Sequence, residues 1–341
     1  MNLVPVLGLL LVALLCVWLI INLVKAPDVW LKAALIGVTN GSVYGLIALG
    51  YTLVYGILEL INFAHGDLFM LGGMLVMSMV GWFGLAAGDA WYVVWPLVFA
   101  MLGLAMLFCG SINITIERIA YKPLRHAPRL APLITAIAMS FILQNIAIAW
   151  KGPNTVTINQ GPGGGADFLP QGTVFSVGSI SYTWPSLIVV LITIPVLAVL
   201  IYLVQQTRQG KAMRATAQDR EAAAMMGINV NRTISFTFLI AGGLAGAGGL
   251  VFSLYFTNIR FDTGFQIGLI AFTSAVLGGI GNLPGAVLGA LLIGLVQSFN
   301  NALPWHAPGS DWTQSIVFVI LILILVFRPE GLLGEQTPEG G

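Results

Sequence analysis

Long apolar segments constrain what this chain can fold into more than any other feature of its sequence. A membrane-spanning α-helix needs about 20 predominantly apolar residues. Runs of roughly this length recur along the chain, and we predict spans over residues 3–24, 33–57, 68–88, 91–116, 131–150, 186–204, 233–256, 266–281, 284–303 and 313–328. The two shortest, 266–281 and 313–328, fit tilted or re-entrant helices. The sequence therefore predicts an all-α, polytopic membrane protein with about ten transmembrane helices.

Charged residues are scarce, which supports the same fold class. They make up 8% of the 341 residues, whereas 58% are hydrophobic. A soluble domain carries roughly 25% charged residues. The net charge of +1 gives no reason to expect nucleic acid as a partner. Cys16 and Cys109 lie far apart in apolar runs and the three histidines are scattered, so neither a disulfide framework nor a metal site is predicted.

The distribution of basic residues predicts the orientation of the chain. Two hydrophilic segments hold nine of the 14 Lys and Arg residues: Arg118, Lys122, Arg125 and Arg129 after the fourth span, and Arg208, Lys211, Arg214, Arg220 and Arg232 in the central insert and just after it. Because basic residues favour cytoplasmic loops, we expect both segments in the cytoplasm and residues 151–185 outside. This order leaves Lys25 and Lys32 outside, against the rule. We therefore interpret the first span as a candidate signal-anchor helix rather than a cleaved signal peptide.

The central insert, residues 205–229, is a charged, alanine-rich segment between two apolar runs. Ala and Met favour helix, Asp219 can cap a second short helix, and Gly227 is typical of a helix stop. We therefore expect two short helices after Gly210. Helices this short need a surface to dock on, and the small residues Ala222 to Ala224 would allow close approach to a partner's groove. The alternative is a solvated loop that happens to be helical.

The outer segment, residues 151–185, predicts a small cap. Four prolines and a glycine cluster over 161–165 interrupt it. Residues 173–184 then alternate around Gly178-Ser179, which is typical of a β-hairpin with a two-residue turn. Such a cap can receive a partner protein or simply close the helix ends, and the sequence favours neither.

Glycines at four-residue spacing share a helix face in three predicted spans: Gly37, Gly41 and Gly45; Gly242 and Gly246; Gly285 and Gly289. Small residues at this spacing let membrane helices approach closely. We therefore predict close helix packing at these positions.

Two polar breaks interrupt the apolar pattern. The first, Glu59 to Asp67, contains ionisable groups that are costly at membrane depth. We favour Asp67 as the cap of a helix beginning at Leu68; the alternative is a broken or re-entrant element beside a transport pathway. The second break runs from Gly278 to Gly285. Breaks in both halves of a chain suggest an inverted-repeat architecture, although no residue-by-residue repeat is visible.

Polar residues within the spans are candidates for the translocation pathway of a small zwitterion: Asn40, Tyr44, Asn62, His65, Gln144, Asn145 and Thr273. Taken singly, each is expected to make an interhelical hydrogen bond. No enzymatic motif accompanies them, because the Gly210-Lys211 pair lacks the upstream glycine of a phosphate-binding loop and is followed by Ala212. We therefore expect no enzyme and no bound cofactor, and any ATP hydrolysis belongs to another polypeptide.

Five stretches, taken together and in order, resemble one family. They are Gly41 to Tyr51, Ile61 to Asp67, Ile116 to Arg125, Gly210 to Ala215 and Ala275 to Ala286. These stretches are similar to those of the permease subunits of branched-chain amino acid ABC importers, the hydrophobic amino acid uptake transporters. The resemblance divides the chain into an extra N-terminal transmembrane segment and linker (1–32), the permease transmembrane domain (33–334) and a C-terminal tail (335–341).

The resemblance implies partners and a mechanism. In this family two homologous permeases pair, each docks a cytoplasmic ATP-binding-cassette ATPase through a coupling helix, and an external binding protein delivers the substrate. The ATPases, not the permease, use ATP and Mg. The coupling residues implied for this chain are Gly210, Arg214, Asp219, Glu221, Ala222, Ala223 and Gly227. The expected activity is import of branched-chain or other hydrophobic amino acids, or related small amides, across the cell inner membrane.

A different class of transporter gives the alternative interpretation. In a proton-coupled secondary transporter of small polar solutes, Glu59, His65 or Asp67 would carry protons. Depletion of ATP at a constant proton gradient separates the two, because only the ABC importer stops.

Overall fold

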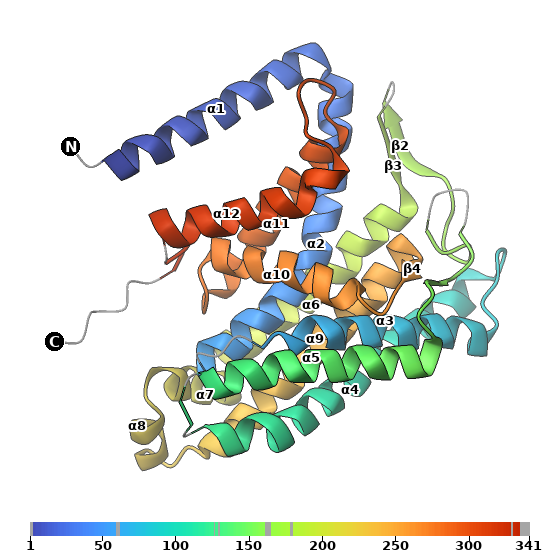
Figure 1. Ribbon diagram of the computed structural model, residues 1–341. Helices are drawn as coiled ribbons and strands as arrows, with labels where there is room; N and C mark the ends of the chain where they lie inside the picture. The colour runs from blue at the N-terminus through green and yellow to red at the C-terminus, as the bar shows by residue number, and fades with distance from the viewer. Residues whose placement is uncertain are drawn as a thin grey trace.

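The computed structural model describes residues 3–58, 62–125, 127–128, 130–160, 165–177, 180–328 and 330–334, with side chains from residue 13 onward. Figure 1 shows a bundle of long helices with two small β-pairs. The long helices of the described chain are α1 (Leu3–Lys25), α2 (Pro27–Leu58), α3 (Ala64–Phe83), α4 (Trp91–Ile116), α5 (Leu130–Lys151), α6 (Trp184–Gln206), α9 (Val230–Phe256), α10 (Thr263–Gly278), α11 (Leu283–Ala302) and α12 (Thr313–Phe327). Each predicted span overlaps one of these helices, although the spans 68–88 and 266–281 extend past the ends of α3 and α10, so the all-α class is confirmed.

The predicted number of membrane crossings is not confirmed. In the part of the chain that the structure describes, eight helical segments are long and apolar enough to cross a membrane. α10, with 16 residues, and the Ala13–Lys25 part of α1 are shorter. The polytopic membrane fold is therefore confirmed, but the count of about ten spans is not. The inverted repeat stays a prediction.

α2 lies in the middle of the bundle, where α3, α6, α9, α10 and α11 pack against it. All its residues from Val43 to Val54 are buried. Glycine permits these close contacts, because a Cβ at Gly41 would lie only 2.7 Å from the Leu291 Cα of α11. Likewise, a Cβ at Gly242 in α9 would lie 2.6 Å from the Cys109 carbonyl oxygen of α4. The predicted close packing at these glycines is confirmed.

The outer segment forms the predicted hairpin. β2 (Thr173–Val177) and β3 (Ile180–Thr183) pair in antiparallel register, with Val177 opposite Ile180. The expected turn at Gly178-Ser179 lies outside the described residues. The hairpin rests on the outer end of α2, where the Tyr182 and Thr39 hydroxyls share a hydrogen bond of 3.0 Å. A second small pair joins β1 (Val156–Thr157) to β4 (Asn258–Ile259).

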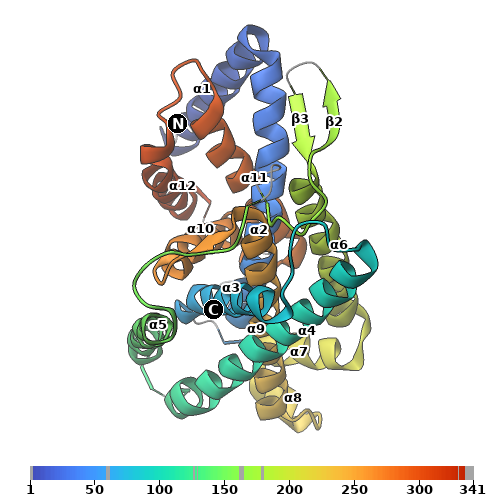
Figure 2. The same cartoon turned by 90° about the vertical axis from the view of Figure 1, so that its right-hand side faces the viewer.

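The central insert and the hairpin lie at opposite ends of the bundle, as Figures 1 and 2 both show. The insert forms α7 (Arg208–Gln218) and α8 (Arg220–Met225). α4 continues into a π-helical turn, η1 (Glu117–Tyr121), and a 3₁₀ turn, η2 (Lys122–Leu124), while η3 (Ser310–Trp312) precedes α12. Because the basic residues of α7 and α8 lie at the end opposite the hairpin, the arrangement agrees with the expected orientation, in which the insert is cytoplasmic and the hairpin is outside.

α1 is attached to the bundle near its C-terminal end. The Lys25 ammonium lies 4.5 Å from the centre of the Trp305 ring, and the Trp18 indole N–H donates a 2.9 Å hydrogen bond to the Trp305 carbonyl. Asn22 also bonds the Trp305 backbone. A cation over an aromatic face is stabilised by the ring's quadrupole. Lys25, which the charge rule placed on the unfavoured side, therefore has a local partner.

Candidate functional site

The central insert, residues 205–229, which carries the predicted coupling residues, consists of two capped helices. The Thr207 hydroxyl caps α7 by accepting a 3.0 Å hydrogen bond from the Gly210 N–H. The Asp219 carboxylate caps α8 by accepting from the Glu221 and Ala222 N–H groups at 2.8 and 3.0 Å. Gly227 adopts a φ of +82° and ends the segment, as expected. The first helix begins at Arg208 rather than after Gly210, because Thr207 supplies a cap that the alanine-rich pattern did not reveal.

α7 folds back onto the C-terminal end of α6. Gly210, Met213 and Thr216 form its buried face. A Cβ at Gly210 would collide with the backbone carbonyl oxygens of Leu203 and Val204, so only glycine permits this close approach. The turn between the two helices is therefore fixed by backbone packing.

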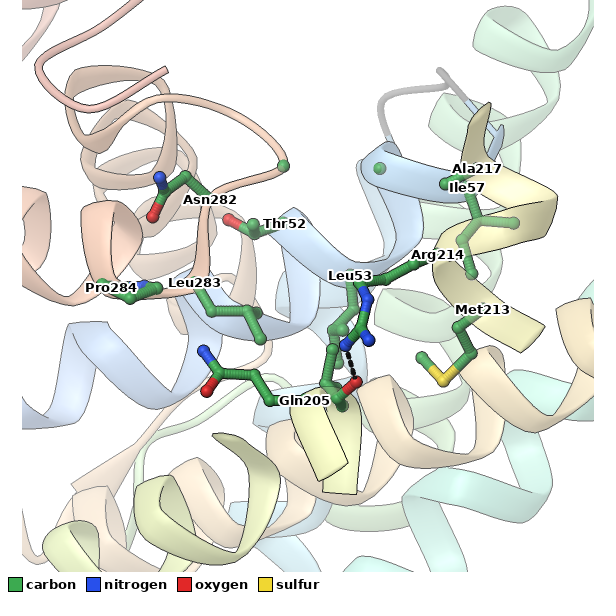
Figure 3. A pocket seen from close by; sticks show the side chains of 13 residues that line it. Thr52, Leu53, Ile57, Gln205, Met213, Arg214, Ala217, Asn282, Leu283 and Pro284 are labelled. Atoms are coloured by element: carbon green, nitrogen blue, oxygen red, sulfur yellow. Dashed lines mark hydrogen bonds between the residues drawn. The ribbon is translucent and has the colours of Figure 1, made fainter. Parts of the chain in front are cut away.

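Two arginines of the segment cap membrane helices. Arg214 donates to the Val204 carbonyl in the last turn of α6, as the dashed line in Figure 3 shows. Arg220 donates a 2.8 Å hydrogen bond to the Ile57 carbonyl in the last turn of α2. Carbonyls in the last turn lack intrahelical partners and carry partial negative charge, which favours a guanidinium there. Any displacement of α7 and α8 must therefore move these ends or break the two caps.

The remaining coupling candidates differ in exposure. Glu221 and Gly227 are exposed and Ala222 is half-buried, whereas Ala223 is only 4% exposed. Ala223 therefore packs against its own chain and presents little surface to a partner. Met225 and Met226, at the end of α8, are each 82% exposed.

A buried ion pair lies beside this segment. Glu117 is fully buried and accepts hydrogen bonds from the Arg125 guanidinium and, at 2.8 Å, from the Ser235 hydroxyl. Arg125 also donates 2.5 Å to the Asn231 side-chain oxygen. Burial lowers the pKa of Arg125, and the Glu117 carboxylate opposes this effect. The pair joins the turn after α4 to the start of α9.

The pathway candidates do not line one surface. Tyr44 donates to Gln297 of α11, Thr273 and Asn145 bond carbonyls of their own helices, and the Asn40 side chain is buried. Asn145 is exposed on α5. Tyr44, Thr273 and Asn40 therefore fit the packing interpretation. Asn145 lies apart from the other candidates.

The other three candidates belong to a polar region around the start of α3. Asn62 accepts a 2.6 Å hydrogen bond from the Tyr121 hydroxyl. His65 is fully buried, with its ring 4.8 Å from the Tyr51 ring, edge to face. Gln144 donates a 3.3 Å hydrogen bond to the Ser140 hydroxyl, which in turn donates to Asp67.

The predicted capping role of Asp67 is wrong. α3 begins at Ala64, three residues earlier than Asp67, and its N-cap residue Phe63 makes no side-chain cap. Asp67 instead lies inside the helix, fully buried, and accepts a hydrogen bond from Ser140 of α5. Glu59, the other carboxylate of this polar stretch, lies outside the described residues.

A cavity of about 390 Å³ opens at the end of the bundle that carries α7, between the ends of α2 and α6, α7, and the α10–α11 turn (Figure 3). Its polar lining comes from Thr52, Gln205, Arg214 and Asn282. Asn282 caps α11 through the Gly285 N–H at 2.9 Å and donates 2.8 Å to the Leu333 carbonyl. None of the seven pathway candidates lines this cavity. Among the described residues no group of His, Cys, Asp and Glu is arranged to hold a metal ion.

Comparison with known proteins decides what this architecture belongs to. Residues 33–326 match the family described as "Branched-chain amino acid transport system / permease component". The chain belongs to this family. The permease is 35% identical over 318 residues to the branched-chain amino acid permease protein BraD of Pseudomonas aeruginosa, covering 92% of this chain and 99% of that protein. It is 34% identical over 305 residues to the LivH permease proteins of Salmonella typhimurium and Escherichia coli, covering 89% of this chain and 95% of theirs.

One solved structure also aligns with the permease. PsaBC from Streptococcus pneumoniae in complex with Fab covers 92% of this chain and 97% of that chain, at 15% identity and a TM-score of 0.39. The family match and the identities confirm the resemblance and the multi-pass inner-membrane location, and they do not favour a secondary transporter.

Sequence reasoning missed two features of the permease. The Met225-Met226 pair could have been found, because two apolar residues directly before a helix stop have little chance of burial. Glu117 stands in a stretch that carried the family resemblance, but its carboxylate bonds Arg125, eight residues along the chain, and Ser235, 118 residues along the chain. Nothing in the local pattern indicates those contacts.

Proposed function

We propose that this permease imports branched-chain amino acids, or related small amides, that an external binding protein delivers, and that separate ATPases drive the import. The printed descriptions of BraD and LivH as branched-chain amino acid permease proteins support the substrate class. The proposed assembly contains two homologous permeases and two cytoplasmic ATPases. ATP and Mg are used by the ATPases, and this chain binds no cofactor and catalyses no reaction.

The observation that carries this proposal is the capping of two membrane helices by one cytoplasmic segment. Arg214 and Arg220 join α7 and α8 to the ends of α6 and α2. An ATPase that moves the segment would therefore move two helices that also border the cavity of Figure 3. Exchange between inward-open and outward-open states from 1:99 to 99:1 needs about 5.5 kcal/mol of differential binding, which ATP binding to the partner would supply.

The docking surface of the segment is its exposed tip. Met225 and Met226 project from the end of α8, and flexible thioether side chains adapt to apolar grooves. Glu221 adds an exposed carboxylate on the same short helix. We assign ATPase contact to these residues, and we assign the buried Ala223 to packing of α8 within this chain.

Cysteine crosslinking in native membranes tests this assignment. Met225→Cys is expected to crosslink to a cysteine-bearing ATPase, whereas Ala223→Cys, two residues away but buried, is not. Crosslinking from neither position, with transport intact, would contradict the coupling role. Uptake measured after ATP depletion at a constant proton gradient then checks the energy source, and uptake that continues would contradict an ATP-driven importer.

The substrate pathway is a separate part of the proposal. The polar region around Asn62, His65 and Gln144 lies beside α5, whose outward face is largely exposed. We assign the pathway to this side of the bundle, where Gln144 of α5 is bonded to the polar region through Ser140. Gln144→Ala should raise the KM for uptake, whereas Asn145→Ala, one residue along but exposed and bonded only to its own helix, should not. The same KM in both variants and in the wild type would contradict this choice.

A further inference from the structure

A second, smaller cavity lies at the cytoplasmic end of the bundle. Its volume is about 280 Å³, and it is enclosed by the end of α2, the segment after η2, the first turn of α5 and the junction of α7 with α8. It shares only Ile57 and Ala217 with the cavity of Figure 3. Its polar lining is supplied by Arg125, Thr216, Gln218 and Arg220.

The lining carries positive charge. Arg220 donates to the Ile57 carbonyl, but among the described residues it has no carboxylate partner. Arg125 is paired with Glu117. Burial lowers the pKa of Arg125, Glu117 opposes this, and the Arg220 charge lowers that pKa further. The two guanidinium groups are therefore close enough to repel one another, and an anion between them would be stabilised.

Two polar atoms of the lining residues lack partners. The Thr216 hydroxyl oxygen and the Arg125 Nε are both buried and, among the described residues, unpaired. Thr216 is fully buried. Buried polar groups in folded proteins are almost always hydrogen-bonded, and leaving one unpaired is unfavourable. Their occurrence on two residues that line one positive cavity points to a ligand rich in acceptor oxygens.

Phosphate has the matching chemistry. It offers several acceptor oxygens to a hydroxyl and to guanidinium groups, which bind it with paired donors. Basic pockets between membrane helices on the cytoplasmic side are also suited to lipid headgroups. We propose that this cavity binds a phosphate-bearing anion, either the headgroup of an anionic phospholipid or free phosphate. The bound anion would join α7 and α8 to the segment after η2. This inference does not depend on the transported substrate.

The test follows thermal unfolding of the purified full-length permease in detergent during titration with three probes. These are inorganic phosphate, short-chain phosphatidylglycerol, and short-chain phosphatidylcholine, whose choline cation opposes a positive cavity. A ligand that binds the folded state raises Tm with its concentration. We expect phosphatidylglycerol or phosphate, but not phosphatidylcholine, to raise Tm. A response to phosphatidylglycerol alone identifies a lipid headgroup, and a response to inorganic phosphate identifies the free ion; both support the site.

Three variants locate the binding. Thr216→Val removes the unpaired hydroxyl at constant shape, so the unliganded protein should keep or raise its Tm while anion binding weakens about threefold or more. Arg220→Gln removes a charge-assisted contact and should weaken binding about tenfold. Arg118→Gln removes the same charge from an exposed position outside the cavity, and it should change binding less than about twofold.

Three outcomes would overturn the proposal. The first is a wild-type Tm that no anion shifts. The second is equal weakening of binding in Arg118→Gln and Arg220→Gln, which would indicate only diffuse attraction. The third is loss of ATPase co-purification in Arg220→Gln with no anion effect on the isolated permease, which would make a protein carboxylate the occupant.

Discussion

The Ser140 hydroxyl donates a hydrogen bond to the Asp67 carboxylate and so ties α5 to α3 in the interior of the bundle. Ser140 lies near the middle of α5, a helix that packs against little besides α3 and η1. Removing the donor would leave a buried carboxylate short of a partner. Ser140→Ala is expected to lower the free energy of unfolding by about 1–3 kcal/mol. Thermal unfolding in detergent measures the change.

Ser111→Ala is the matched control for this change. Ser111 is exposed and bonds only the Leu107 carbonyl of its own helix. Its loss should change stability by less than about 0.5 kcal/mol. Equal destabilisation in the two variants would show that the Asp67 contact has no special weight.

Gly210→Ala should uncouple the cytoplasmic segment. The added methyl group would meet the carbonyls of Leu203 and Val204, so α7 must move away from α6. Overpacking of this kind costs about 1–3 kcal/mol, and transport should fall by about tenfold or more while the protein still reaches the membrane. Uptake per molecule of membrane-inserted permease is the measurement. Gly103→Ala, where a Cβ meets nothing within 4 Å, serves as the control and should keep full uptake.

Glu117→Ala should be strongly destabilising. The substitution leaves the Arg125 charge half-buried without its carboxylate and removes the acceptor of Ser235. Removal of one partner from a buried ion pair costs about 3–5 kcal/mol, so we expect a large fall in Tm and in membrane yield. Glu221→Ala removes an exposed carboxylate from the same cytoplasmic end and should leave Tm unchanged. The double variant Glu117→Gln/Arg125→Gln should recover part of the loss; no recovery would show that the pair is not the cause.

Acid should weaken the start of α10. Arg260 donates hydrogen bonds to Asp262 and lowers the pKa of that carboxyl, although partial burial opposes this. A carboxyl whose pKa is depressed in the folded state contributes stability above its ordinary pKa of about 3.9 and loses it as pH falls through the lower folded value. The Tm of the wild type should therefore fall below pH 4 by more than that of Asp262→Asn. Parallel curves for the two proteins would contradict this assignment. The effect should be small and sensitive to salt, because the pair is largely exposed.

The elements could be predicted from sequence where one local pattern decides them. Apolar runs placed all ten long helices, because a helix is the simplest structure that satisfies every backbone group in lipid. The hairpin followed from alternation, and the two helices of the insert followed from composition and the cap at Asp219. Length alone did not establish which helices cross the membrane, as α10 shows.

The interior contacts could not be predicted in this way. Asp67 had a satisfactory local explanation as a cap, yet α3 begins at Ala64 and the carboxylate finds its partner 73 residues away in the sequence. The start of α3 is fixed by backbone packing on α10, where a Cβ at Gly66 would lie 2.9 Å from the Gly268 Cα. Ala223 likewise resembled a docking residue by size, but only the fold shows that its small side chain serves an internal contact. The roles of these residues in transport stay predictions.

α2 is one unbroken helix of 32 residues, and its two halves contact different parts of the chain. At the outer end Thr39 bonds Tyr182 of the hairpin, and at the inner end the Ile57 carbonyl accepts from Arg220. A protein that displaces the hairpin would therefore act on α2, the same helix to which Arg220 of α8 is hydrogen-bonded. Thermodynamic linkage makes the exchange symmetric: whatever factor an outer ligand imposes on inner affinity, an inner ligand imposes on the outer one. Binding of a partner at the hairpin and binding of the ATPase at α8 would then be coupled through α2.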